Sequence, residues 1–198
     1  MITLRQIERL WAAGDYVRIS RTFMEMRAES SPELIAEFSH QIPAAAMAVI
    51  RLDELSQSHV PFCGRMIREI FSSQEADGGW GDAMTTALCL RALMCSGGDG
   101  VAIDRGLQYL VNLQRSDGLW PKVPLRRMPG DAYVSAVVLY ELAAEPRSGR
   151  AIRVGDALAW LDVHQGELDA ATTRLWRIIS RRHGAAARQE RSAVGVWS

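Results

Sequence analysis

Two aspartates stand at matching places in the sequence and are its best candidates for acid chemistry. Asp82 and Asp131 each follow a glycine and precede an alanine at the start of an apolar run. A carboxyl group at the mouth of a cavity can act as a general acid, and this is the catalytic role that we consider for both. The same position is also that of a helix N-cap. The sequence leaves both interpretations open, and with them the question whether the protein is an enzyme.

A basic loop over residues 121–129, just before the second aspartate, is the next element with possible chemistry. Lys122, Arg126 and Arg127 supply its cations, and three prolines stiffen it. Such cations can clamp a phosphate, a diphosphate or a carboxylate, so we include all three among the candidate ligand-binding residues. The alternative is a solvated connector that happens to be basic.

Histidine and cysteine do not complete a metal site in the sequence. His59 and Cys63 are four residues apart and could share a helix face, but no second pair accompanies them. A phosphate-binding glycine loop and a dinucleotide fingerprint are also missing. We therefore expect no metal and no cofactor. An odd number of cysteines, three, favours a reducing compartment, which predicts a cytoplasmic protein.

The composition is that of a globular protein. The chain has 198 residues, 48% of them hydrophobic and 23% charged, which suits one domain and excludes general disorder. Lys and Arg together number 23, as do Asp and Glu, so we expect no nucleic-acid partner. The longest apolar stretch, residues 42–50, is too short to span a bilayer, and the first residues lack the order of a signal peptide.

The segment after Ala170 is basic, with six arginines and one glutamate. Apolar residues lie between the arginines, as in an amphipathic helix. Such a helix can pack as the last helix of the domain with a solvated arginine face, or it can lie on a membrane surface. Contact with a membrane would therefore be peripheral at most.

An internal repeat organises the middle of the chain. Residues 74–80 carry Gln, Asp, Gly and Trp at a spacing that returns in residues 114–120, at an offset of 40. The Gly-Asp-Ala that follows returns at an offset of 49, because the second copy contains the longer loop. A fainter third copy covers residues 158–165 and lacks the Gly and Trp after Gln165, as terminal repeats often do.

Apolar residues recur at helical spacing along nearly the whole chain, and no alternating strand pattern stands out. We expect Gly78 and Gly118 to end helices in the left-handed conformation. For the N-terminal third, the pattern predicts the following helices: one from Leu4 to Trp11, one from Tyr16 to Met26, one opened by Ser31 and Pro32 and broken at Pro43, and a continuation from Ala44 to Leu55.

The repeat resembles the QW motif of triterpene cyclases. Its most complete copy consists of Arg105, Gly106, Tyr109, Leu110, Gln114, Gly118 and Trp120. The resemblance, which also extends to protein prenyltransferase β-subunits, implies an all-α fold of stacked antiparallel helical hairpins in an α/α toroid or a partial toroid. We place N-terminal hairpins at 1–58, the repeats at 59–184 and a flexible basic tail at 185–198, in one compact domain.

In the motif, glutamine and tryptophan have a structural role. We expect Gln74 and Gln114 to hydrogen-bond to the backbone at the start of the next helix, and Trp80 and Trp120 to pack over that junction. These four residues should therefore join successive hairpins rather than take part in chemistry.

The catalytic residues of the known families are largely absent. No Asp-x-Asp-Asp acid run occurs in the sequence. Met84 and Tyr133 stand where the prenyltransferase pattern has its cysteine zinc ligand, so we expect no zinc. The motif therefore indicates the fold more strongly than the activity.

These observations predict a binding module with a concave apolar surface. Its partner would be a protein segment or an apolar, isoprenoid-like molecule. The alternative is a small cyclase or transferase of isoprenoid or natural-product metabolism that uses Asp82 or Asp131 as its acid. Because the hairpins are few for a closed ring, a second copy could close it as a homodimer. The candidate wall residues are Met84, Thr85, Cys89, Tyr133, Ser135 and Val138.

Overall fold

The protein is all-α, as its sequence predicts. The computed structural model describes residues 3–26, 40–98 and 100–194, with side chains described for 3–22, 40–98 and 100–183. Within these residues, none of the helices has both the length and the apolar character that a bilayer span requires. The helices are α1 (Leu4–Ala12), α2 (Tyr16–Met26), α4 (Gln41–Glu54), α5 (Pro61–Ser72), α6 (Ala83–Cys95), α7 (Gly100–Leu113), α8 (Ala132–Leu142), α9 (Pro146–Ala151), α10 (Val154–Val163) and α11 (Ala170–Val194).

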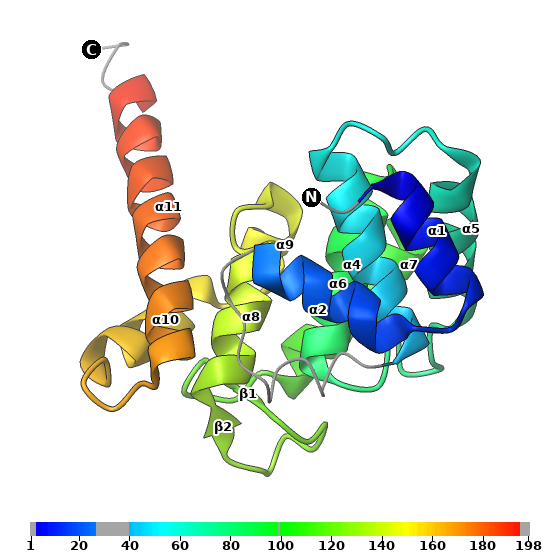
Figure 1. Ribbon diagram of the computed structural model, residues 1–198. Coiled ribbons are helices and arrows are strands. Elements are labelled where there is room, and N and C mark those ends of the chain that lie inside the picture. Colours follow the sequence, from blue (N-terminus) through cyan, green and yellow to red (C-terminus); the bar gives the residue numbers. More distant parts are fainter. Residues whose placement is uncertain (1–2, 27–39, 99, 195–198) are drawn as a thin grey trace.

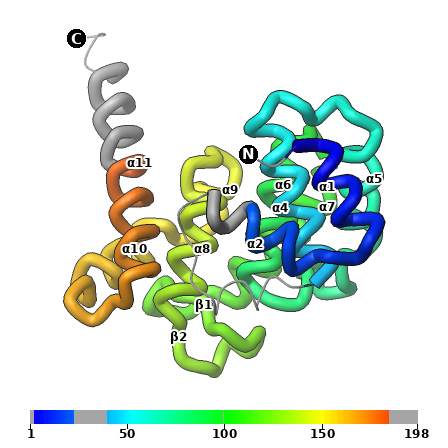
Figure 2. The backbone as a smooth tube through the Cα atoms, viewed as in Figure 1, coloured from blue at the N-terminus to red at the C-terminus, as the bar shows by residue number. Residues whose placement is uncertain are grey.

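One continuous row of helices runs through the described part of the molecule. In this row α2 packs against α4, α4 against α6, α6 against α8, and α8 against α11. The intervening helices α5, α7 and α10 pack beside members of the row. Figure 1 places α1 and α5 at one end of the molecule and α11 at the other, and the tube in Figure 2 follows the same path. A short antiparallel pair, β1 (Trp120–Pro121) and β2 (Gly130–Asp131), precedes α8.

The central helices of the row are buried on nearly all sides. Residues 43–50 of α4, 83–90 of α6 and 134–139 of α8 are all buried. A helix that is apolar all round, rather than along one stripe, is suited to a position between neighbours. In α4 four of these residues are alanines without any exposed surface, which allows close approach of the adjacent helices.

The N-terminal helices begin where the sequence predicts. Thr3 and Gln6 form a capping box at the start of α1, and Asp15 accepts the Arg18 N–H at 3.1 Å at the start of α2. The predicted break at Pro43 is wrong, because α4 begins at Gln41 and Pro43 lies in its first turn. There the missing N–H has no helical partner to lose. The helix expected to open at residues 31 and 32 lies outside the described residues.

Helix α11 uses its apolar face for packing. Leu175 and Ile179 are each 2% exposed, and the helix contacts α8 and α10. The Trp176 indole N–H donates to Asp162 Oδ1 at 2.6 Å. These contacts support the packed last helix over a helix lying on a membrane. The helix continues past residue 185 to Val194, so the expected basic tail begins as helix, and residues 195–198 lie outside the described part.

Candidate functional site

Two glutamines join the helices outside the row. Gln74, after α5, donates its Nε2 to the Ala102 carbonyl in the first turn of α7 at 2.9 Å. Gln114, after α7, donates its Nε2 to the Arg153 carbonyl just before α10 at 3.2 Å. Each amide also donates to a carbonyl within its own turn at 2.8 Å. The two junctions thus have the same construction, and they connect α5 to α7 and α7 to α10.

The tryptophans of the repeat fix the end of the preceding helix. The Trp80 indole N–H donates to the Ile70 carbonyl at 2.7 Å, and the Trp120 indole N–H donates to the Leu110 carbonyl at 2.9 Å. Trp80 is 5% exposed and Trp120 is fully buried. Each indole therefore buries a large apolar ring and also has a hydrogen-bond acceptor for its N–H group.

The repeat glycines permit close helix contact at these turns. Gly78 and Gly118 have φ values of +94° and +85°. A Cβ atom on Gly78 would lie 2.6 Å from the Arg105 carbonyl oxygen, and one on Gly118 would lie 2.5 Å from the Ala157 nitrogen. The expectation that these glycines end helices is wrong, since α5 already ends at Ser72. Their role is to let α7 touch the first turn and α10 touch the second.

Asp82 and Asp131 are N-caps in the structure. Asp82 accepts the Thr85 N–H at 2.9 Å and the Thr85 hydroxyl at 2.8 Å. Asp131 accepts the Val134 N–H at 2.9 Å. Because α6 packs against α8, the two aspartates begin adjacent helices. The capping interpretation is confirmed, and the carboxylates are held by the helices that they begin.

The six predicted wall residues lie on α6 and α8 and are mostly in the interior. Ser135 accepts the Trp120 N–H at 2.9 Å, so its hydroxyl belongs to the repeat junction. None of the six lines the cavity beside α8, α9 and α11 or the one along α11. Their exposures are 6% for Met84, 8% for Thr85 and 0% for Cys89, Ser135 and Val138, and Tyr133 is half-buried.

The three predicted cations lie on the surface, apart from the predicted wall residues inside α6 and α8. Lys122, Arg126 and Arg127 are all exposed in the loop between β1 and β2. Asp131 lies at the base of this loop, opposite Trp120 in the strand pair. The structure therefore brings the second aspartate and the basic loop to one end of α8, while the first aspartate begins the neighbouring helix.

The cysteines are thiols in an apolar setting. Burial raises the pKa of Cys63, raises that of Cys89 further, and raises that of Cys95 to about 12. The charge of Asp82 adds to the effect at Cys89. All three are unpaired and protonated at neutral pH, which makes them poor nucleophiles. In the part of the chain that the structure describes, no three His, Cys, Asp or Glu side chains form a group that could hold a metal ion.

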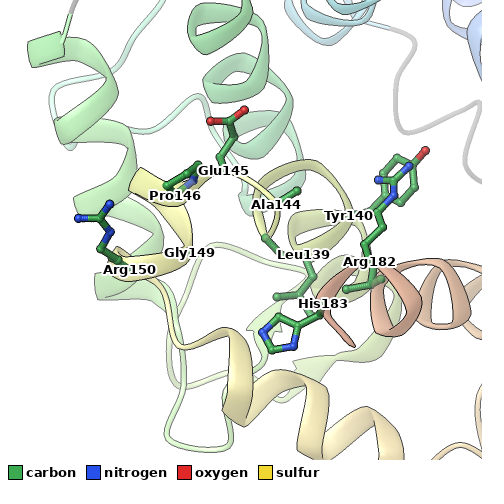
Figure 3. Close-up of a pocket in the computed structure, with 11 residues that line it drawn as sticks. Leu139, Tyr140, Ala144, Glu145, Pro146, Gly149, Arg150, Arg182 and His183 are labelled. Carbon is green, nitrogen blue, oxygen red and sulfur yellow. The ribbon is translucent and has the colours of Figure 1, made fainter. Parts of the chain in front are cut away.

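A cavity of about 470 Å³ lies between the end of α8, α9 and the middle of α11 (Figure 3). Its inner surface is apolar, with Leu139 and Ile179 only 1% and 2% exposed. Alanine and glycine residues on either side of Glu145 leave the space between the helices unfilled. Its size and lining are those of a small-molecule site.

The rim of this cavity is basic. The Arg182 guanidinium lies over the Tyr140 ring, 4.7 Å from its centroid, and His183 lies beside Leu139 (Figure 3). Glu145 also lines the cavity, but its carboxylate pairs with Arg91 at 2.8 Å. The other two charged side chains that line the cavity, Arg150 and Arg182, are both basic. The arrangement can hold an apolar chain against the inner surface and an anionic group at the rim.

Sequence reasoning missed this cavity. Tyr140 belongs to the repeat, whereas Arg182 and His183 belong to the basic C-terminal segment, and no motif or spacing connects them. They come together only through the packing of α8 against α11, for which the sequence contains no signal.

Comparison with known proteins finds no matching family model, no matching curated protein and no matching solved structure. The chemistry of the site therefore has to be inferred from its own residues.

Proposed function

We propose that this chain is a QW-type α/α-repeat protein, with its helices arranged as part of a toroid, and that it is a binding module for an amphiphilic small molecule. The packing of the helices supports the arrangement, because α2, α4, α6, α8 and α11 follow one another in a row. The glutamine junctions support it as well, since they join α5, α7 and α10 beside that row.

The observation that carries the binding function is the cavity between α8, α9 and α11. Leu139 and Ile179 give it an apolar inner surface that suits an isoprenoid-like or fatty chain. The Arg182 guanidinium lies over the Tyr140 ring, 4.7 Å from its centroid, where it can offer N–H donors to an acid group. A planar guanidinium suits the bidentate recognition of a carboxylate or a phosphate.

The alternative of a small cyclase or transferase gains no support from the two aspartates. Asp82 accepts hydrogen bonds on both carboxylate oxygens from Thr85, and Asp131 caps α8. An acid that protonates an alkene has to be a proton donor that faces its substrate. The binding function requires no such group.

The test compares ligands and variants. Palmitate and hexadecanol have chains of the same length, but palmitate ends in a carboxylate and hexadecanol in a neutral hydroxyl group. Calorimetric titration measures the affinity of the protein for each. Arg182→Gln should weaken palmitate binding by about 10- to 100-fold, the range expected for hydrogen bonds to a charged group. It should leave hexadecanol binding nearly unchanged. Arg177→Gln, an exposed arginine of α11 that does not line the cavity, is the matched control.

Equal effects of the two arginine variants, or no binding of either ligand, would contradict the proposal. Native mass spectrometry of protein purified from its own host gives an independent result. A retained lipid supports the small-molecule function, whereas a retained protein chain in its place would favour a protein segment as the partner.

A further inference from the structure

We propose that the loop between β1 and β2, residues 122–129, is a docking surface for an anionic lipid bilayer. Every residue of this loop is exposed. In Figure 1 the loop projects from the base of α8, away from the helices. This proposal concerns a surface separate from the cavity and does not depend on the ligand proposed above.

The loop combines exposed apolar side chains with cations. Val123, Leu125 and Met128 are 46%, 45% and 37% exposed, which makes this short segment unusually rich in large apolar side chains facing solvent. Arg126 and Arg127 lie between the last two of them, and the loop contains no acidic residue. Apolar side chains that enter the acyl boundary while cations remain among the head groups are the pattern of an interfacial anchor.

The fold holds these apolar side chains outward. The Arg115 guanidinium donates to the Met128 carbonyl at 2.8 Å and to the Arg126 carbonyl at 3.4 Å. Inside the loop, the Leu125 N–H donates to the Val123 carbonyl at 2.6 Å, and the Met128 N–H donates to the Leu125 carbonyl at 2.8 Å. These bonds hold the backbone of the loop in the conformation in which the three apolar side chains are exposed.

The shape of the loop favours a bilayer over a protein partner. A stable protein interface buries about 800 Å² on each side, which needs a broad surface around the anchor residues. A projecting loop with exposed apolar side chains needs only to enter the outer few ångströms of a leaflet. The positive charge of Arg126 and Arg127 complements anionic head groups.

The experiment is vesicle sedimentation with the full chain. Equimolar phosphatidylcholine–phosphatidylglycerol vesicles should bind the protein, and pure phosphatidylcholine vesicles should bind it much more weakly. The double variant Arg126→Gln and Arg127→Gln should lose about 25-fold, or about fivefold for each cation. The double variant Val123→Ser and Leu125→Ser should lose on the order of tenfold. Raising the salt concentration should weaken binding of the wild type.

Matched controls lie elsewhere on the surface. Val163→Ser changes an apolar residue that is 79% exposed, and Arg174→Gln with Arg177→Gln removes two exposed cations of α11. Both should bind vesicles as the wild type does, and circular dichroism checks that every variant is folded. Equal losses in the controls, or wild-type binding by the loop variants, would overturn the proposal.

Two further outcomes would also overturn it. If inorganic phosphate displaces the protein from vesicles better than chloride at equal ionic strength, the loop is a clamp for a free anion. If the wild type binds no vesicles at all, the bilayer is not its partner. The Arg182→Gln variant should bind vesicles normally, which separates this test from that of the cavity.

Discussion

The side-chain amide of Gln114 and the backbone of Arg153 are bonded to each other in both directions. The Arg153 N–H donates to Gln114 Oε1 at 3.0 Å, and Gln114 Nε2 donates to the Arg153 carbonyl at 3.2 Å. Gln114 is only 1% exposed, so its amide is largely shielded from water. One side chain thereby completes the backbone hydrogen bonding where α7 meets α10.

Replacement of this glutamine should be costly. We expect Gln114→Ala to lower the free energy of unfolding by about 2–3 kcal/mol, because buried backbone groups would lose their partners. Gln165 occupies the corresponding place in the third repeat and is exposed, so Gln165→Ala should change stability by less than about 0.5 kcal/mol. Urea unfolding measures both values, and equal midpoints would show that the junction is unimportant.

The Trp120 indole should stabilise the fold both through its buried surface and through its hydrogen bond, and two substitutions separate these contributions. Trp120→Ala should cost about 3–5 kcal/mol, as other buried large aromatics do. Trp120→Phe keeps much of the apolar surface but removes the indole donor, while the Leu110 carbonyl still accepts the Gln114 N–H at 2.9 Å, so we expect a loss of about 0.5–1.5 kcal/mol. Thermal and urea unfolding should rank the variants in this order. A Phe variant as damaging as the Ala variant would mean that the hydrogen bond, rather than burial, dominates.

Gly118 should tolerate no side chain. Gly118→Ala combines a φ of +85° with a Cβ atom 2.5 Å from the Ala157 nitrogen. Left-handed backbone costs about 1–2 kcal/mol for a residue with a Cβ atom, and overpacking adds about 1–3 kcal/mol. Gly155→Ala is the control, because its position in α10 has no atom within 4 Å of an added Cβ. That variant should be neutral or stabilising by up to about 1 kcal/mol. Similar stabilities would contradict the close contact.

Asp131 should behave as a cap. Asp131→Ala should cost about 1 kcal/mol, and Asp131→Asn, which retains an acceptor for the Val134 N–H, should cost much less. Chemical unfolding at several salt concentrations measures the difference. If Asn were as destabilising as Ala, the charge of the carboxylate would matter beyond its hydrogen bond.

Stability should fall in alkaline solution because of the cysteines. Burial raises the pKa of Cys63, Cys89 and Cys95 above the ordinary value of 9.0, to about 12 for Cys95. The folded state therefore holds these protons more tightly than the unfolded state. The resulting stabilisation is complete below about pH 9 and is lost as the pH rises towards about 12. Tyr109, whose pKa burial also raises, acts in the same direction.

The melting temperature between about pH 8 and pH 10.5 measures this loss. A variant with all three cysteines changed to alanine should show a shallower decline than the wild type. If the melting temperatures of the two proteins fell in parallel, the thiols would not be the cause of the loss of stability in alkaline solution.

The repeat junctions could be predicted because their signal is local. Gln114, Gly118 and Trp120 lie within seven residues, and the same spacing occurs 40 residues earlier. The prediction at Pro43 failed for a local reason as well. A proline is tolerated or disruptive according to its distance from the helix start, and His40 makes no side-chain cap hydrogen bond that would mark that start.

The cavity could not be predicted, because it depends on where α11 packs. Tyr140 and Arg182 meet only when α8 and α11 lie side by side. In the sequence, Arg182 is one of several arginines that follow apolar residues at helical spacing. Nothing in that periodicity distinguishes the arginine that stacks on a ring from those that remain in solvent.

Gly78 and Gly118 have a consequence for how the sequence can change. At each turn an added Cβ atom would collide with backbone, that of Arg105 in α7 for Gly78 and that of Asp156 and Ala157 in α10 for Gly118. Backbone cannot yield as the end of a flexible side chain does, so a collision there requires the whole helix to move. Both positions are therefore closed to every residue with a Cβ atom as long as α7 and α10 keep their places.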